Sequence, residues 1–419
     1  MTTRIGALSL AAVVTVTLAY TGVQAACDTT TTTTTSTTIP GCCTYSMLQF
    51  TTGIGVGNCG TVQRSIGTVV MNLACGGRYS GGGSNQLPEP LALPDLSRTF
   101  TKITTCSSST GAITLGPVAD PGGTSITAVS HRTCSAPGCL FGPPLPVPNA
   151  SNTPTSICIV NTVSTAASGT ANCATGVASI SLPLSSQFFL TGDKEPSRPG
   201  IQTCPTCVGG ICQSGMNVGG ACVPADTNLG FSGPTSQDCP PDPMASIGIL
   251  AIAFQLTTAT RSQTAFNPGT QGGVFCGFCY DGDASGTLGT GGYGKCQGGV
   301  NAGKVCASIV GCPGSTCGGA IACTSDAQCE PSGGVESREA CRQGSSGSAN
   351  PEGAFGKASA NTITENGVSA GNLTDGSPHS MTLVSIFCEP PTFTAGWDAL
   401  NDLPGPAAES FVGAAQLVP

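Results

Sequence analysis

The stretch IGILAIAFQL, residues 247–256, decides the fold that we expect for this chain. It is apolar on both of the faces that alternate along a strand, which favours a central strand buried on both sides. MTLVSIFC, residues 381–388, has the same character near the C-terminal end. Two such segments need further strands beside them, so the rest of the chain should supply a sheet.

A third strand is expected where Ile180, Leu182 and Leu184 alternate with residues of the opposite face. Pro183 lacks the N–H that a strand donates, so it predicts that this strand lies at a sheet edge. Weaker strand candidates are TVVMNLA (68–74), AITLG (112–116) and TSICIVNTV (155–163). Together these segments predict an all-β chain with a β-sandwich-like body and disulfide-rich, loop-dominated insertions.

The composition favours strands and loops over helices. Of 419 residues, 60 are glycine and 31 are proline, and both residue types oppose helices. Hydrophobic residues make up 39% of the chain, which is enough to bury a core. The net charge is −8 and no basic run occurs, so we expect no nucleic-acid partner.

Residues 1–25 are expected to be a signal peptide. Arg4 precedes an apolar run, and the triplet VQA at 23–25 supplies small residues where a signal peptidase cuts. Residues 26–44 follow as a Thr-rich stalk or linker, whose run of threonines has no apolar residue to bury. We therefore expect export to the cell surface or beyond. A lipid on Cys27 is the alternative to plain cleavage and the only membrane contact that we expect.

All 25 cysteines follow the signal peptide, and in an oxidising compartment their default state is the disulfide. Because their number is odd, one is lipidated, free or bonded to another chain, and a lipid on Cys27 would leave an even set. The disulfide candidates are Cys204, Cys207, Cys212, Cys222, Cys276, Cys279, Cys296, Cys306, Cys312, Cys317, Cys323 and Cys329.

An internal repeat organises these cysteines. Each copy has a C-x-x-C pair, at 204–207 or 276–279, followed after a spacer by the unit C-Q-x-G-x-N-x-G-x-x-C. This unit spans residues 212–222 in the first copy and 296–306 in the second. Its shared glycines and asparagine should form the tight turns of a small stapled loop, because both residue types tolerate positive φ.

The cysteine blocks divide the chain into segments. After the stalk we expect a β-rich domain (45–200), Cys-rich repeat 1 (201–240), a β segment (241–275), Cys-rich repeat 2 (276–345) and a C-terminal β segment (346–419) that packs on the β-rich body. The Cys-rich blocks are interpreted as insertions between strands of one body. Separate modules joined in series are the alternative.

Three other chemistries compete for the Cys-rich blocks. Four-thiolate zinc sites and a C-x-x-C dithiol catalyst are weaker hypotheses than a disulfide scaffold, since export favours disulfides. Gly298, Gly303 and Lys304 also have the spacing of a phosphate-binding loop. Val305 stands where such a loop needs Ser or Thr, and the first repeat has Gly220 in place of the lysine. We expect no nucleotide site.

Calcium is the one cofactor that the sequence hints at. Asp281, Asp283 and Ser285 have the spacing of the first oxygen ligands of an EF-hand loop, with Gly286 at its turn position. Gly292 occupies the position of the closing acid, so the site is a calcium candidate only.

Motifs of catalysis are absent from the sequence. The only histidines are His131 and His379, and neither lies in a motif such as H-E-x-x-H or G-x-S-x-G. We therefore name no catalytic residue and expect the protein not to be an enzyme. An extracellular hydrolase whose site is dispersed in sequence is the alternative from that class.

The stretch GCLFGPPLPVPN (138–149), the C-Q-x-G-x-N-x-G-x-x-C units and the Thr stalk resemble a group of uncharacterised exported proteins of environmental bacteria. The resemblance runs over most of the mature chain and implies export and a shared design of strands and cysteines. It carries no known activity, so it transfers no functional residue. The leading hypothesis is a secreted or surface-tethered protein that builds, adheres to or binds an extracellular component. A calcium-dependent binding module is a further alternative.

Overall fold

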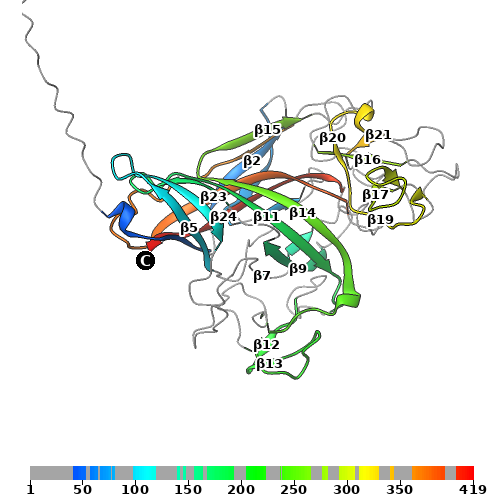
Figure 1. Cartoon of the computed structure of the whole chain (residues 1–419), viewed down its shortest axis with the longest axis horizontal. Coiled ribbons are helices and arrows are strands. Elements are labelled where there is room, and N and C mark those ends of the chain that lie inside the picture. The colour runs from blue at the N-terminus through cyan, green and yellow to red at the C-terminus, as the bar shows by residue number, and fades with distance from the viewer. Residues whose placement is uncertain are drawn as a thin grey trace, which may run out of the picture. The chain divides into compact units, whose positions relative to one another are not determined.

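The computed structural model describes residues 41–52, 57–64, 67–76, 78–80, 98–118, 139–141, 145–147, 155–163, 168–192, 204–222, 236, 238–265, 276–281, 292–306, 311–329, 340–343, 361–391 and 403–419 (Figure 1). These residues form strands and the short 3-10 turns η1 (Cys42–Thr44), η2 (Pro243–Ala245) and η4 (Asp326–Gln328). The all-β class is confirmed. Within the described residues, no helix is long and apolar enough to span a membrane.

The body is one antiparallel sheet that closes on itself. Its order is β10-β6-β5-β1-β24-β23-β14-β11, and a pairing between β10 and β11 completes a ring of eight strands. Figure 1 shows the long strands β11, β14, β23 and β24 side by side. The ring strands are β1 (Met47–Thr52), β5 (Arg98–Cys106), β6 (Ala112–Val118), β10 (Ser168–Asn172), β11 (Ala178–Phe189), β14 (Ser246–Thr257), β23 (His379–Glu389) and β24 (Gly405–Val418).

The main hydrophobic core fills the inside of this ring. Leu115 of β6, Leu182 of β11, Phe254 of β14 and Phe411 of β24 belong to it. The rings of Phe254 and Phe387 lie 4.6 Å apart between their centroids. Large apolar side chains from nearly every strand thus meet in one place, which is what stabilises a sheet that has no second layer of helices.

The stretch that decides the fold is central, as expected, but it is buried on one face only. β14 lies between β11 and β23, yet its side chains alternate between the core and the surface. Leu250 and Ile252 are buried, whereas Ile249 is 59% exposed. The expectation of burial on both faces was therefore wrong for 247–256, because the closed ring covers only its inner face. It holds for β23, where residues of both faces are buried.

The strand that carries Pro183 is not an edge strand. β11 pairs with β14 along its length, and on its other side it pairs first with β10 and then with β9 (Thr155–Val163). The register with β10 ends at Ser181 and that with β9 begins at Leu184. Pro183 falls in the gap between the two partners, where a strand needs no N–H to donate. The physical rule for proline was right, and the inference of an edge was wrong.

Short strands extend the ring and a second sheet packs on its outside. β7 (Cys139–Phe141) and β8 (Leu145–Val147) pair with β9, and β4 (Arg78–Ser80) pairs with β24. The second sheet has the order β15 (Arg261–Ala265), β22 (Asn361–Glu365), β2 (Asn58–Arg64) and β3 (Val69–Ala74). Its Val62 and Ile363 join Ile386 of β23 and Ala408 of β24 in a separate small core.

The first and last strands of the described residues pair with each other. Met47 of β1 pairs with Val418 of β24, and the Ser46 N–H donates to the Val418 carbonyl over 3.1 Å. The ring takes strands from the segments 45–200, 241–275 and 346–419, so residues far apart in sequence complete one sheet. The first Cys-rich segment lies between β11 and β14 of the ring, and the second lies between β15 and β22 of the second sheet.

Candidate functional site

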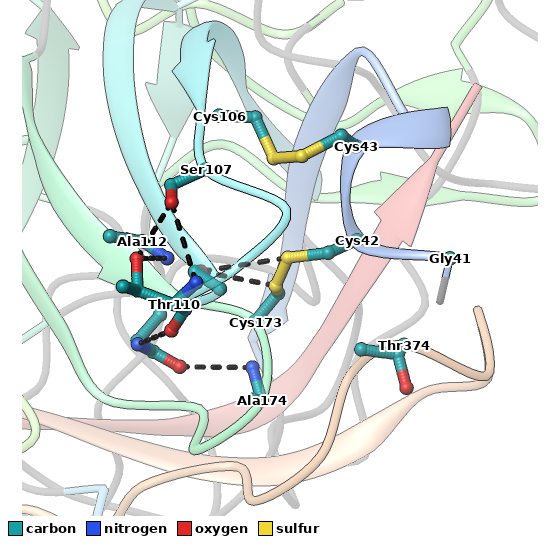
Figure 2. Close-up of a disulfide and its surroundings, with 12 residues drawn as sticks. Gly41, Cys42, Cys43, Cys106, Ser107, Thr110, Ala112, Cys173, Ala174 and Thr374 are labelled. Carbon is teal, nitrogen blue, oxygen red and sulfur yellow. Dashed lines mark hydrogen bonds between the residues drawn. A yellow bond between two sulfur atoms is a disulfide. The ribbon is translucent and has the colours of Figure 1, made fainter. Parts of the chain in front are cut away.

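Two adjacent disulfides fix the N-terminal end of the described residues. Cys42 bonds to Cys173 in the turn between β10 and β11, and Cys43 bonds to Cys106 at the end of β5. Figure 2 shows the two bonds side by side, with the turn that contains Ser107 and Thr110 folded against them. The Cys173 sulfur lies 3.1 Å from the Gly111 carbonyl oxygen. Neighbouring residues of the chain are thus tied to separate parts of the ring.

The Cys-rich segments fold into three small units, each with two disulfides. Knot 1 comprises 204–222, 236 and 238–242, knot 2 comprises 292–306 and 311–319, and knot 3 comprises 276–281, 320–329 and 340–343. Their strands are β12 (Cys207–Val208) and β13 (Ile211–Cys212) in knot 1; β17 (Gly294–Cys296), β18 (Val305–Cys306) and β19 (Cys317–Gly318) in knot 2; and β16 (Gly277–Tyr280), β20 (Ala322–Cys323) and β21 (Ala340–Arg342) in knot 3.

All twelve cysteines proposed from the sequence lie in disulfides. The knots contain Cys207–Cys222 and Cys212–Cys239, Cys296–Cys312 and Cys306–Cys317, and Cys279–Cys329 and Cys323–Cys341. Cys158–Cys204 ties knot 1 to β9, Cys276–Cys388 ties knot 3 to β23, and Cys59–Cys75 joins β2 to the end of β3. Three sulfurs in each knot lie within 4.8 Å of one another, but bonded sulfurs are not the thiolates that zinc needs.

Knots 1 and 2 share the hydrogen bonds of their repeated unit. The Cys212 N–H donates to Gly220 and the Cys296 N–H donates to Lys304, each over 2.9 Å. The side-chain amide of Asn217 donates to the Asp238 carbonyl, as that of Asn301 does to Gly311, again over 2.9 Å. The repeated asparagine therefore holds the residue before a Cys-Pro pair, at 239–240 or 312–313. Sequence reasoning missed this Cys-Pro signal.

The repeated glycines lie where a side chain would not fit. Gly215 and Gly299 have φ angles of 78° and 74°, which L side chains rarely adopt. A Cβ at Gly215 would collide with the Pro240 carbonyl oxygen, and one at Gly299 would collide with that of Pro313. The unit is thus conserved between the two knots in the residues that its backbone requires.

Knot 1 is a circular permutation of knot 2. Cys207 pairs in register with Cys212, and Cys317 pairs in the same way with Cys296. Cys207 and Cys317 each follow a threonine, and the carbonyl of that threonine accepts the backbone N–H of the glutamine in the repeated unit. The Thr-Cys strand nevertheless precedes the repeated unit in knot 1 and follows it in knot 2. The structural equivalent of Cys207 is therefore Cys317, so the proposed match between the C-x-x-C pairs was wrong.

Knot 3 repeats the pattern a third time and contains knot 2. Cys279 pairs in register with Cys341, Gly277 pairs with Cys323, and the Cys279 N–H donates to Ile321 over 2.9 Å. Register and disulfides match those of knot 2 when Cys279 is placed on Cys296. Knot 2 lies between β16 and β20 in the chain, so one copy is inserted into another.

The calcium candidate is only partly described. Asp281 is 9% exposed and forms a β-bridge with Gly292, through N–H···O bonds of 2.8 and 3.0 Å. Strands β16 and β17 flank the loop, where an EF-hand has helices. Asp283 and Ser285 lie outside the described residues, so calcium binding stays a prediction.

His379 does not form a proton relay. Its Nε2 lies 2.9 Å from Asp375 Oδ1 and 3.2 Å from Ser377 Oγ, so one ring nitrogen meets both groups. In a Ser-His-Asp triad the acid and the serine occupy different nitrogens. Hydrogen bonds from His379 and Ser377 lower the pKa of the exposed Asp375 carboxyl to about 2. His131 lies outside the described residues.

A buried carboxyl group joins the second sheet to the ring. Glu365, at the end of β22, is 1% exposed, and its Oε2 has no hydrogen-bond partner among the described residues. Burial raises the pKa of Glu365 well above its usual value, and the nearby charge of Glu409 raises it further. A hydrogen bond from the Ser385 backbone N–H opposes this rise. Nothing in the sequence around Glu365 indicated that it would be buried.

Comparison with known proteins adds no family: no family model, curated protein or solved structure matches this chain.

Proposed function

We propose that the protein is exported and held at the cell surface by its Thr-rich stalk, where its β body presents three disulfide knots for ligand binding or adhesion. The observation that carries this proposal is the recurrence of one knot in three positions. Knots 1 and 2 keep the glutamine, the asparagine and the turn glycines of the repeated unit and differ at other positions, some of them exposed. Met216 is 60% exposed in knot 1, and its counterpart Val300 is 85% exposed in knot 2.

The disulfides support an oxidising compartment. Eleven of them lie within the described residues, and cytosolic thiols are kept reduced. They take up 22 of the 25 cysteines. The others are Cys27 and Cys134, which lie outside the described residues, and Cys139, whose side chain is not described. An odd set of three cannot pair completely within one chain, which supports a lipid or an external bond on Cys27.

An intact mass of the mature protein tests the proposal. We expect denatured, unreduced protein to take up at most one alkyl group, and its first residue to carry extra mass if Cys27 is lipidated. Fractionation of the producing cells should place the protein outside the cytoplasm. A Cys27→Ala variant should then separate a lipid anchor from retention by the stalk. Several reactive thiols, together with a cytoplasmic location, would contradict export.

A further inference from the structure

We propose that knots 3 and 2 together form a binding site for an acidic polysaccharide, on a row of side chains with the order Arg342, Tyr280, Tyr293, Lys295. This inference rests on the proposed function, because it names a ligand for the displayed knots. Two of the five tyrosines in the chain lie in this row, in a protein whose 14 basic residues are otherwise scattered.

The first half of the row belongs to knot 3. The Arg342 guanidinium carbon lies 4.5 Å from the centroid of the Tyr280 ring. Arg342 pairs in register with Phe278, and Phe278 and Tyr280 share one face of β16 because they are two residues apart. The register therefore places the cation on the face that carries the tyrosine. Arg342 is exposed and Tyr280 is partly exposed, so solvent reaches both.

The second half of the row belongs to knot 2. The Tyr293 ring lies 4.9 Å from that of Tyr280, between centroids, with 63° between the ring planes. Lys295 lies two residues further along the extended chain, on the same face as Tyr293. Both are partly exposed. The bridge between Asp281 and Gly292, the neighbours of the two tyrosines, fixes one knot against the other.

Among the described residues of knots 2 and 3, basic side chains outnumber acidic ones. Within the described residues, neither Arg342 nor Lys295 forms an ion pair. Of the two acids described in these knots, Asp281 is buried, whereas Asp326 is exposed and accepts the Cys341 N–H over 2.8 Å. Lys304 of knot 2 is partly exposed, but the register of β17 with β18 places it on the face opposite to Lys295. The row itself presents two cations, Arg342 and Lys295, on a chain of net charge −8.

This combination fits a sugar chain that carries carboxylates. The C–H faces of sugar rings pack on aromatic rings, and the guanidinium of an arginine can hold a carboxylate through two hydrogen bonds. A neutral polysaccharide would leave both cations without a partner. Nucleic acid fits less well, because a duplex-binding protein commonly contacts about six to ten phosphates and the row has only two basic residues.

Binding to polygalacturonate tests the proposal, with dextran and duplex DNA of similar length as comparison ligands. We expect the purified mature protein to bind polygalacturonate, to bind dextran at least tenfold more weakly, and to lose affinity as salt rises. Lys295→Glu and Tyr293→Ala should each weaken binding at least tenfold. Arg261→Glu, the same reversal of charge on β15 of the second sheet and outside the row, is the matched control and should leave binding unchanged.

Each contrary result is decisive. Absence of binding to polygalacturonate, or binding that Lys295→Glu and Tyr293→Ala leave intact, would overturn the site. Equal binding of dextran would overturn the role of charge, and tighter binding of DNA would overturn the ligand class. Each variant is first shown to protect the same number of cysteines from alkylation, so that misfolding is not read as loss of binding. Export plays no part in this measurement, so its outcome is independent of where the protein resides.

Discussion

Glu365 shows how one buried acid can set the response of the fold to pH. Its pKa is raised by burial, so the folded state binds a proton more strongly than the unfolded state does. The stability contributed by the protonated group is complete below its unfolded pKa. It is lost as pH rises through the raised, folded pKa.

Glu365→Gln should therefore stabilise the protein on the alkaline side. The amide is nearly the same shape as the protonated acid but cannot ionise. We expect similar melting temperatures for variant and parent near pH 4, and a variant that melts higher by roughly 2–5 °C above the folded pKa. Thermal melts between pH 4 and pH 9 check this. A constant difference across that range would show that the charge of Glu365 does not matter.

Gly299 and Gly303 illustrate two reasons why a repeated position needs glycine: a positive φ angle alone, or a positive φ angle together with a close backbone contact. Both have positive φ, but a Cβ at Gly299 meets the Pro313 carbonyl and one at Gly303 meets nothing within 4 Å. Gly303→Ala should cost about 1 kcal/mol for the backbone conformation alone. Gly299→Ala should cost clearly more, because the chain must also shift. Chemical denaturation of both variants gives the comparison, and equal losses would contradict the close approach.

Among the elements, the strands were easier to predict than their partners. TSICIVNTV at 155–163 is β9 to the residue, because β-branched side chains mark a strand locally. The sequence did not reveal that β10 and β9 share one side of β11, so Pro183 was misplaced. The relation between the knots was mispredicted for a related reason. Disulfide connectivity does not follow from the spacing of cysteines, and aligning two segments in chain order does not reveal a permuted or inserted copy. The row from Arg342 to Lys295 depends on that connectivity, and no sequence pattern indicated that its four residues would lie together.

Knot 2 should open without disturbing knot 3. Cys306 and Cys317 close a short loop of sequence separation 11, so replacing both with serine should cost about 2–3 kcal/mol locally. The bonds of knot 3 lie outside the inserted segment, at Cys279–Cys329 and Cys323–Cys341. Disulfide mapping of the double variant should find both still formed. Their scrambling would mean that the two knots are one cooperative unit.

At the scale of the whole molecule, the sequence indicated strands and insertions but not the closed ring. Closure depends on β24 pairing with β1 and on β10 pairing with β11, contacts that no local pattern records. The position of β1 has a mechanical consequence. A pull on the chain from the N-terminal side of Cys42 would peel β1 from its partners one pair at a time, were Cys42 and Cys43 not bonded to the ring just before it.

Removing both bonds should expose β1. We expect the variant with serine at Cys42, Cys43, Cys106 and Cys173 to lose about 4 kcal/mol or more, since long loops of the unfolded chain are released. Brief proteolysis should cut it near residue 52 while the parent stays intact. The matched control replaces Cys59 and Cys75, whose sequence separation is 16, and should leave β1 protected. Cleavage of both variants at the same rate would rule out the anchoring role.

On the proposed route of export, in which the chain would leave a translocon with its N-terminus first, the insertion of knot 2 into knot 3 also fixes the order in which cysteines become available. The four cysteines of knot 2 are all outside once residue 317 has appeared, whereas knot 3 waits for Cys341 and its tie to the ring waits for Cys388. Cys279 emerges before any cysteine of knot 2, so an oxidant that joins thiols in order of arrival would bond it to the wrong partner. Such a bond has to be broken and formed again, so on the proposed route of export, cells without a disulfide isomerase should release more of this protein mispaired at Cys279 than cells that have one.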